Sequence, residues 1–192
     1  MTIAILGKGN MGKGLGQRLA GKTNIVFGSR SGTSYGDAVQ AADIVVLALP
    51  YAAALEEAAK LDLAGKVVVD MSNPITADFS GLTIGHSTSA AEEIAKVAKG
   101  ARVVKAFNTI FAGLFDVPAS ATANVPVFVA GNDEAAVAAV ADLAVKAGFA
   151  VEKIGDLTGA RLVEPVGMLN IRLGYGLGQG TAIAPAWLKL AA

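Results

Sequence analysis

The chain begins with a strand-like run, Ile3-Ala-Ile-Leu6, followed directly by Gly7-Lys-Gly-Asn-Met-Gly12. The apolar residues Met11, Leu15 and Leu19 then recur at helical spacing. In a strand–turn–helix unit, the first glycine allows a tight turn, the second lets the backbone approach a pyrophosphate, and the third permits close helix–strand packing. The free N–H groups at the start of such a helix bind anions. We therefore predict a dinucleotide-binding turn made by Gly7, Lys8, Gly9, Asn10, Met11 and Gly12. A purely structural turn, with Lys8 solvated, is the alternative.

Apolar runs and helical patterns alternate through most of the remaining chain. The predicted strands are 3–6, 24–28, 44–49, 66–70, 102–105, 125–130 and 149–154, and most are continuous β-branched runs typical of strands covered on both faces. Helices are predicted at 52–60, at 89–100 behind a Ser-Ala-Ala-Glu capping box, and at 134–147. This rhythm predicts an α/β fold of the Rossmann type, with a doubly wound, mostly parallel sheet.

From residue 158 the pattern changes. Leu162, Val166, Leu169 and Leu173 mark one face of a helix, and Pro165 must lie in its first turn or kink it. Glycine then occupies every second position from 174 to 180. We expect a dinucleotide-binding domain at 1–157 and a C-terminal helical appendage at 158–192, both in one structural unit and the second a possible dimer contact.

Composition excludes several classes of protein. The chain has 192 residues, 16 basic and 16 acidic, and 38 alanines account for much of its 53% hydrophobic content. The even charge balance argues against a nucleic-acid partner, and no apolar run is long enough for a membrane span. With no cysteine and one histidine, there is no disulfide framework and no metal site to expect. Without a recognisable secretory signal we expect a cytoplasmic protein.

The end of the second predicted strand indicates which dinucleotide binds. An NAD site normally places Asp or Glu there to hold the ribose 2′-hydroxyl. This chain instead has Gly28-Ser-Arg-Ser31, with no acidic residue before Asp37. A guanidinium flanked by hydroxyls suits a 2′-phosphate, so we predict NADP held by Ser29, Arg30 and Ser31. A surface arginine on a loop is the alternative.

Three further stretches leave the predicted sheet at its carboxyl edge, where ligands bind in this architecture. They predict a nicotinamide pocket lined by Ala48, Leu49, Pro50, Tyr51, Asn73, Pro74, Phe107, Asn108 and Thr109.

Groups for acid–base chemistry are scarce in the sequence. His86 is the only histidine and lies on a loop, where we expect it to be solvated. Lys105 is better explained as an edge lysine than as an acid or base. Hydride transfer between stacked cofactor rings needs mainly positioning and exclusion of water, so no catalytic side chain is predicted.

Together these motifs resemble a known family. Gly7–Gly14, Gly28–Arg30, Ala48–Pro50 and Arg161–Glu164 are similar to the NADP-dependent oxidoreductases typified by the archaeal reduced-deazaflavin:NADP oxidoreductase. The Lys105–Ile110 stretch is more similar to the cytosolic domain of the six-transmembrane metalloreductases. The archaeal enzymes have histidine where Asn108 stands. The resemblance implies NADP(H) at the sheet edge, a second tricyclic cofactor stacked on the nicotinamide, and a dimer through the C-terminal region.

We therefore expect an oxidoreductase that passes hydride between NADP(H) and a small-molecule redox acceptor, namely FMN, FAD or a deazaflavin. One alternative is an NADPH-dependent reductase of a small organic substrate at a dimer-built site. The other is a non-catalytic NADP(H) sensor.

Overall fold

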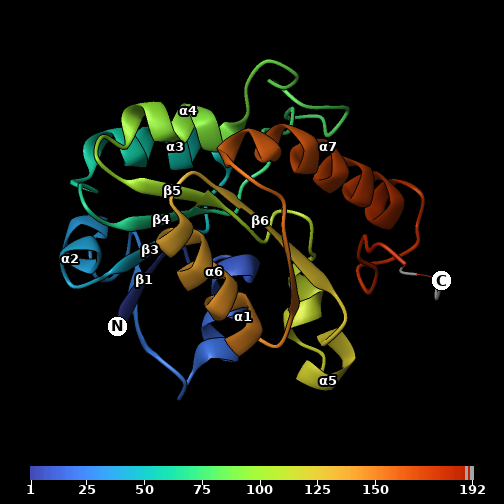
Figure 1. The fold of residues 1–192 in the computed structure, drawn as a ribbon, viewed down its shortest axis with the longest axis horizontal. Helices are drawn as coiled ribbons and strands as arrows, with labels where there is room; N and C mark the ends of the chain where they lie inside the picture. Colours follow the sequence, from blue (N-terminus) through green and yellow to red (C-terminus); the bar gives the residue numbers. More distant parts are fainter. Residues whose placement is uncertain (189, 191–192) are drawn as a thin grey trace.

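A computed structural model describes residues 1–188 and 190, so residues 189, 191 and 192 of the predicted appendage lie outside the described residues. A seven-stranded sheet forms the centre of the molecule, in the order β2-β1-β3-β4-β5-β6-β7 (Figure 1). The strands are β1 Thr2–Leu6, β2 Asn24–Gly28, β3 Ile44–Leu47, β4 Val67–Asp70, β5 Arg102–Lys105, β6 Pro126–Gly131 and β7 Ala150–Lys153. All seven predicted strands are present; the third ends two residues earlier than predicted.

The first five strands of the sheet are parallel, whereas β6 pairs antiparallel with β5 and parallel with β7. This confirms a doubly wound, mostly parallel sheet of the Rossmann type. The strand order reverses at β1, which lies between β2 and β3. Ligands bind at such a switch point, outside the carboxyl ends of the strands.

Helices cover both faces of the sheet (Figure 1). One apolar cluster joins the sheet to α1 (Asn10–Leu19) and α6 (Glu134–Lys146). A second cluster joins the opposite face to α2 (Tyr35–Gln40), α3 (Tyr51–Lys60) and α4 (Ala90–Val97). Burial of both strand faces explains why the strands read as continuous apolar runs.

The helix ends follow the predicted signals. Ser89 Oγ accepts from Glu92 N at 3.2 Å, and Asp133 Oδ1 accepts from Ala136 N at 2.7 Å. Gly100 and Gly148, which follow α4 and α6, both have positive φ angles. Asn132, the residue before Asp133, accepts from Leu157 N at 2.9 Å.

Two short helices, η1 (Ala112–Phe115) and α5 (Ala119–Thr122), connect β5 to β6, and η1 packs against α1. Arg18 fixes this connection, because its guanidinium donates to the carbonyls of Leu114, Phe115, Val117 and Ala147 at 2.6–3.2 Å.

The last helices are a one-turn η2 (Leu157–Gly159), α7 (Ala160–Ile171) and a π-helical turn η3 (Arg172–Gly176). The predicted domain boundary between 157 and 158 falls inside η2, and the division into two parts stays a prediction. Pro165 lies inside α7 rather than in its first turn, so it leaves the Arg161 carbonyl without an α-helical donor.

The apolar stripe predicted on α7 faces outward. Leu162 and Leu169 are 70% and 55% exposed. The buried face of α7 instead consists of Ala160, Val163, Glu164, Gly167 and Asn170.

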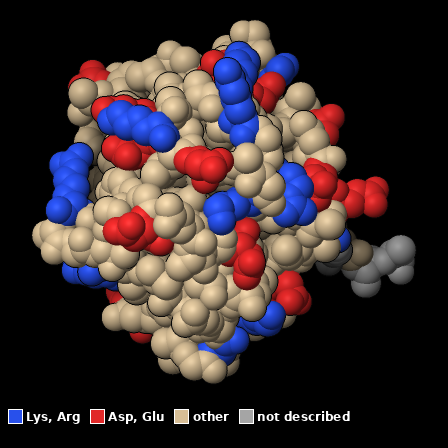
Figure 2. All heavy atoms as spheres, turned by 90° about the vertical axis from the view of Figure 1, so that its left-hand side faces the viewer, with Lys and Arg blue, Asp and Glu red and all other residues tan. Residues whose placement is uncertain are grey.

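Positive and negative side chains are interspersed over the face of the molecule shown in Figure 2. Within the part of the chain that the structure describes, no helix combines the length and apolar character needed to cross a bilayer. The cytoplasmic location stays a prediction.

Candidate dinucleotide and acceptor site

The three glycines of the predicted turn differ in their surroundings. Gly7 has φ +111°, and a Cβ there would lie 2.4 Å from the Ala48 carbonyl oxygen. A Cβ on Gly12 would lie 2.2 Å from the Gly7 carbonyl oxygen. In contrast, a Cβ on Gly9 would have no atom within 4 Å. Gly7 and Gly12 therefore permit close backbone packing, while Gly9 leaves open space in front of α1.

The start of α1 has no acidic residue in its first turn and no side-chain cap. The first N–H groups of any α-helix have no partner within the helix, and here no described side chain caps them. Gly9, the N-cap residue, leaves open space beside them. The arrangement suits a phosphate group, because the positive end of the helix dipole lies at the same place.

The loop after β2 brings a hydroxyl and an ammonium group together. Ser29 N donates to Thr33 O at 2.9 Å, which folds the loop back on itself. A Cβ on Gly32 would lie 2.9 Å from Ser29 Oγ and 3.6 Å from Lys8 Nζ. Ser29 Oγ is buried and has no hydrogen-bond partner among the described residues. Arg30 and Ser31 are exposed on the same loop.

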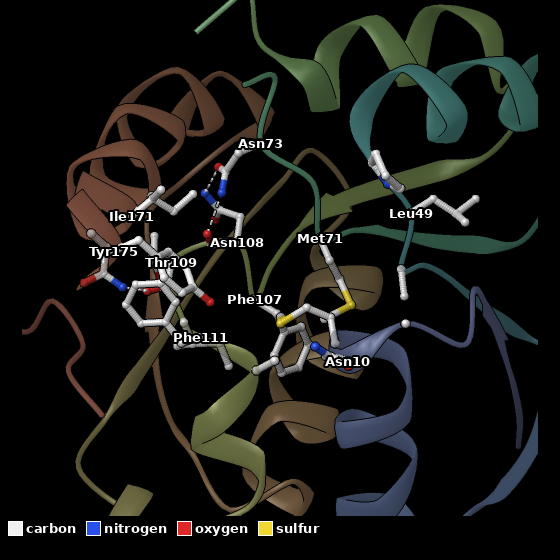
Figure 3. Close-up of a pocket in the computed structure, with 18 residues that line it drawn as sticks. Asn10, Leu49, Met71, Asn73, Phe107, Asn108, Thr109, Phe111, Ile171 and Tyr175 are labelled. Carbon is white, nitrogen blue, oxygen red and sulfur yellow. Dashed lines mark hydrogen bonds between the residues drawn. The ribbon is translucent and has the colours of Figure 1, made fainter. Parts of the chain in front are cut away.

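A pocket of about 380 Å³ opens beside the glycine turn (Figure 3). Ten of the predicted residues line it: Gly9, Asn10, Met11, Ala48, Leu49, Pro50, Asn73, Phe107, Asn108 and Thr109. Eight others line it that the sequence analysis did not single out: Met71, Ile110, Phe111, Ala112, Gly167, Asn170, Ile171 and Tyr175. The last four belong to α7 and η3, so the C-terminal helix forms one wall of the pocket.

Paired amides join that wall to the sheet. Asn108 Nδ2 donates to Asn73 Oδ1 at 2.8 Å and to Val163 O at 2.9 Å, and Asn73 Nδ2 donates to Asn108 O at 2.8 Å (Figure 3). Asn170 Nδ2 donates to the Thr109 carbonyl at 3.1 Å. A Cβ on Gly167 would lie 2.7 Å from the Asn73 amide, so only glycine lets α7 come this close without a shift.

Two polar atoms at the pocket have no partner among the described residues: Asn108 Oδ1 and Thr109 Oγ1, both buried. Beside them, Phe107 is fully buried with φ +64°, a backbone conformation that costs a bulky residue energy. Unpaired polar groups and backbone strain both tend to occur at ligand-binding sites.

The remaining predicted residues lie outside the pocket. Gly7 and Gly12 support the turn, and Lys8, Ser29, Arg30 and Ser31 lie toward the β2 end of the site. Pro74 is buried, and its carbonyl accepts from Thr83 N. Tyr51 is half-buried; burial raises the pKa of its hydroxyl, with smaller contributions from Glu93, Glu164 and Asp70. Tyr51 therefore stays protonated at neutral pH.

The interpretation of Lys105 as an edge lysine is wrong. β5 lies inside the sheet, and the Lys105 side chain is fully buried. Its Nζ contacts Asp70 Oδ2 at 2.8 Å, Glu164 Oε1 at 2.7 Å and Ser72 O at 2.5 Å. All three ammonium protons have acceptors. Lys105 does not line the pocket, and His86 is exposed, as expected.

Comparison with known proteins agrees with this geometry. Residues 31–74 match the family model described as NADP oxidoreductase, coenzyme F420-dependent. The chain is 32% identical to the F420-dependent NADP reductase of Methanocaldococcus jannaschii, over 90% of this chain and 92% of that protein. It is 30% identical to the metalloreductase STEAP3 of Rattus norvegicus, over 85% of this chain but only 36% of that protein.

A solved structure from Arthrobacter sp. FB24, described as an F420-dependent NADP-reductase, has a TM-score of 0.81 and 32% identity. The match covers 93% of this chain and 96% of that one. Fold, pocket and relatives together define an NADP-dependent oxidoreductase. Within that class, the chain belongs to the F420-dependent NADP oxidoreductase family, as its sequence motifs suggested.

The open space at Gly9 yields the first prediction. We expect Gly9→Val to fold, because a Cβ at this position would have no atom within 4 Å. The branched side chain should nonetheless block the approach of a pyrophosphate and weaken NADPH binding by roughly 100-fold or more, about 2.7 kcal/mol. Titration of NADPH fluorescence measures the affinity, and Gly81→Val is the control, because Gly81 lies outside the pocket and a Cβ there would also have no atom within 4 Å. Unchanged affinity would mean that the glycine stretch is only a turn.

Proposed function

We propose that this protein transfers hydride between the nicotinamide of NADP(H) and a flavin or deazaflavin bound in the pocket beside it. The observation that carries the proposal is the composition of the pocket. Among the described residues that line it, there is no Asp, Glu, Lys, Arg or His. Such a wall suits a reaction between two stacked rings, which requires positioning and exclusion of water rather than proton transfer from a side chain.

The residues fit NADP along the sheet edge. The N–H groups at the start of α1 would hold the pyrophosphate, with Gly9 leaving the room for it. The unpaired Ser29 hydroxyl and the Arg30 guanidinium would hold the 2′-phosphate. Lys8, brought beside Ser29, supplies a second positive charge there.

The pocket itself fits a ring system. Its apolar side chains include Met11, Leu49, Met71, Phe111 and Ile171. Two polar atoms of the pocket have no protein partner in the described part of the chain, the carbonyl oxygen Asn108 Oδ1 and the hydroxyl Thr109 Oγ1. They would form hydrogen bonds with the polar edge of a bound ring or with its carboxamide group. A deazaflavin is favoured as acceptor because relatives of nearly the same length are named F420-dependent.

We also propose a homodimer formed through α7. The outward stripe places the exposed Leu162 and Leu169 on a helix whose other face is packed. Exposed apolar stripes of this kind mark interaction surfaces, and a symmetric second copy offers the same stripe. The half-buried Val166 and Leu173 extend it along α7 and into η3.

The 2′-phosphate assignment gives the second prediction. Arg30→Ala should weaken NADPH binding by about 10- to 100-fold, which corresponds to one charge-assisted contact of roughly 1.5–3 kcal/mol. Binding of NADH, which lacks the phosphate, should change little. Arg102→Ala is the control. Arg102 lies at the start of β5, outside the β2 loop, and its guanidinium is 4.0 Å from Asp133 Oδ1. Equal losses for the two dinucleotides would contradict the assignment.

The acceptor is tested by stopped-flow oxidation of NADPH with coenzyme F420, FMN and FAD in parallel. We expect single-turnover transfer to coenzyme F420, and slower or no transfer to the flavins. Tight NADPH binding with no transfer to any of the three would contradict the proposed function. That result would favour reduction of a small organic substrate or a sensor of NADP(H).

The dimer gives a fourth prediction. Replacement of both exposed leucines, Leu162→Glu with Leu169→Glu, should convert a dimer to a monomer in sedimentation equilibrium while leaving the circular dichroism spectrum intact. Phe79→Ser, at an exposed apolar residue outside α7, is the matched control. A wild-type protein that sediments as a monomer would refute this interface.

A further inference from the structure

A buried charge cluster lies directly behind the pocket, on the α3/α4 side of the sheet. It contains Asp70, Lys105 and Glu164, whose side chains are 0%, 0% and 1% exposed. Lys105 bridges the two carboxylates. Asp70 and Lys105 are register partners at the ends of the neighbouring strands β4 and β5, whereas Glu164 comes from α7.

Each carboxylate also accepts a hydrogen bond from a backbone N–H group. Asp70 Oδ1 accepts from Ser72 N at 2.8 Å, which shapes the turn after β4. Glu164 Oε2 accepts from Ala90 N at 3.0 Å, at the first residue of α4. The cluster therefore links the β4 turn, β5, the start of α4 and α7 through hydrogen bonds whose donors and acceptors have little freedom to move.

Stability alone is a poor explanation for this cluster. Removing an ion from water costs several kcal/mol, so a buried ion pair is often no better than apolar residues of similar volume. Two carboxylates share one ammonium here, and burial raises the pKa of the Glu164 carboxyl despite the nearby Lys105. Ionic contacts fix the direction and register of the elements that they join, whereas apolar packing does not.

The register of α7 matters because α7 is the wall of the pocket. Gly167, one helical turn after Glu164, contacts the Asn73–Asn108 amide pair, and Asn170 holds the Thr109 carbonyl. A small rotation of α7 about its axis would move Ile171, and with it the face that an acceptor ring contacts.

We propose that Lys105 and Glu164 are positioning residues for the redox reaction, which fix α7 so that the acceptor ring lies at the right height and angle over the nicotinamide. This inference rests on the proposed function. Neither residue lines the pocket, so their effect passes through the β4 turn and α7. Displacement of a reacting ring by about 1 Å can reduce a rate roughly 100-fold, which gives such a linkage a measurable consequence.

The test neutralises the cluster without changing its volume, in the triple variant Asp70→Asn/Lys105→Met/Glu164→Gln. The new amide oxygens can still accept from Ser72 N and Ala90 N. We expect NADPH affinity to stay within about threefold of wild type, because the glycine turn and the β2 loop are untouched. The single-turnover rate of hydride transfer from NADPH to saturating coenzyme F420 should fall about tenfold or more. Amide hydrogen exchange in α7 should become faster, while exchange in α1 stays the same.

The control is Glu92→Gln, which weakens the neighbouring ion pair of Arg161 with Glu92 at 2.6 Å. That pair also joins α7 to α4 but does not reach β5, so we expect the transfer rate to stay within about twofold. If the triple variant does not fold, Glu164→Gln alone is measured in the same way.

Wild-type transfer rate in the folded variant would overturn the inference, as would an NADPH affinity that falls in proportion to the rate. Unchanged hydrogen exchange in α7 would also overturn it. A wild-type protein that transfers hydride to none of coenzyme F420, FMN and FAD would instead overturn the proposed function. In that case hydrogen exchange still tests whether the charge cluster holds α7 in place, so the two failures are distinguishable.

Discussion

The close backbone contact between the glycine turn and the end of β3 is the constraint on which the rest of the site depends. The Gly7 Cα lies so near the Ala48 carbonyl that no side chain fits between them, and Gly12 closes against Gly7 in the same way. This contact sets α1 with its first N–H groups toward the pocket, and it sets the Ala48–Pro50 segment as the opposite rim. Everything added later in the chain, including α7, completes a site whose glycine-turn end is already fixed.

Much of this end could be predicted from sequence because its signals are local. A strand, three spaced glycines and a helical repeat specify a known turn, and the structure has close packing at Gly7 and Gly12 and open space at Gly9. The binding of a pyrophosphate there stays a prediction. The strands of the sheet were recognisable for a similar reason, since burial on both faces leaves continuous apolar runs. The reversed direction of β6 and β7 could not be predicted, because an apolar run contains no information about the direction of its strand in the sheet.

The other end of the site was harder to predict because its signals are non-local. The leucine repeat in α7 predicted a helix, but the more apolar face points outward and the face with Glu164, Gly167 and Asn170 is buried. Those residues are buried because their partners are amides, carbonyls and an ammonium group, which lie 59 to 94 residues earlier in the chain. Lys105 was misjudged in the same way. A lysine is seldom fully buried, and only the fold shows that three acceptors surround it.

The reversal of β6 and β7 has a consequence for how the protein is made. The chain leaves β7 at the edge of the sheet away from the pocket, so the helix that follows can run back and close the pocket from outside. On the ribosome, residues up to about 50 contain the whole glycine turn, but the pocket wall emerges only with residues 160–176. A nascent chain therefore contains the glycine turn and its rim well before it contains the helix that forms the pocket wall.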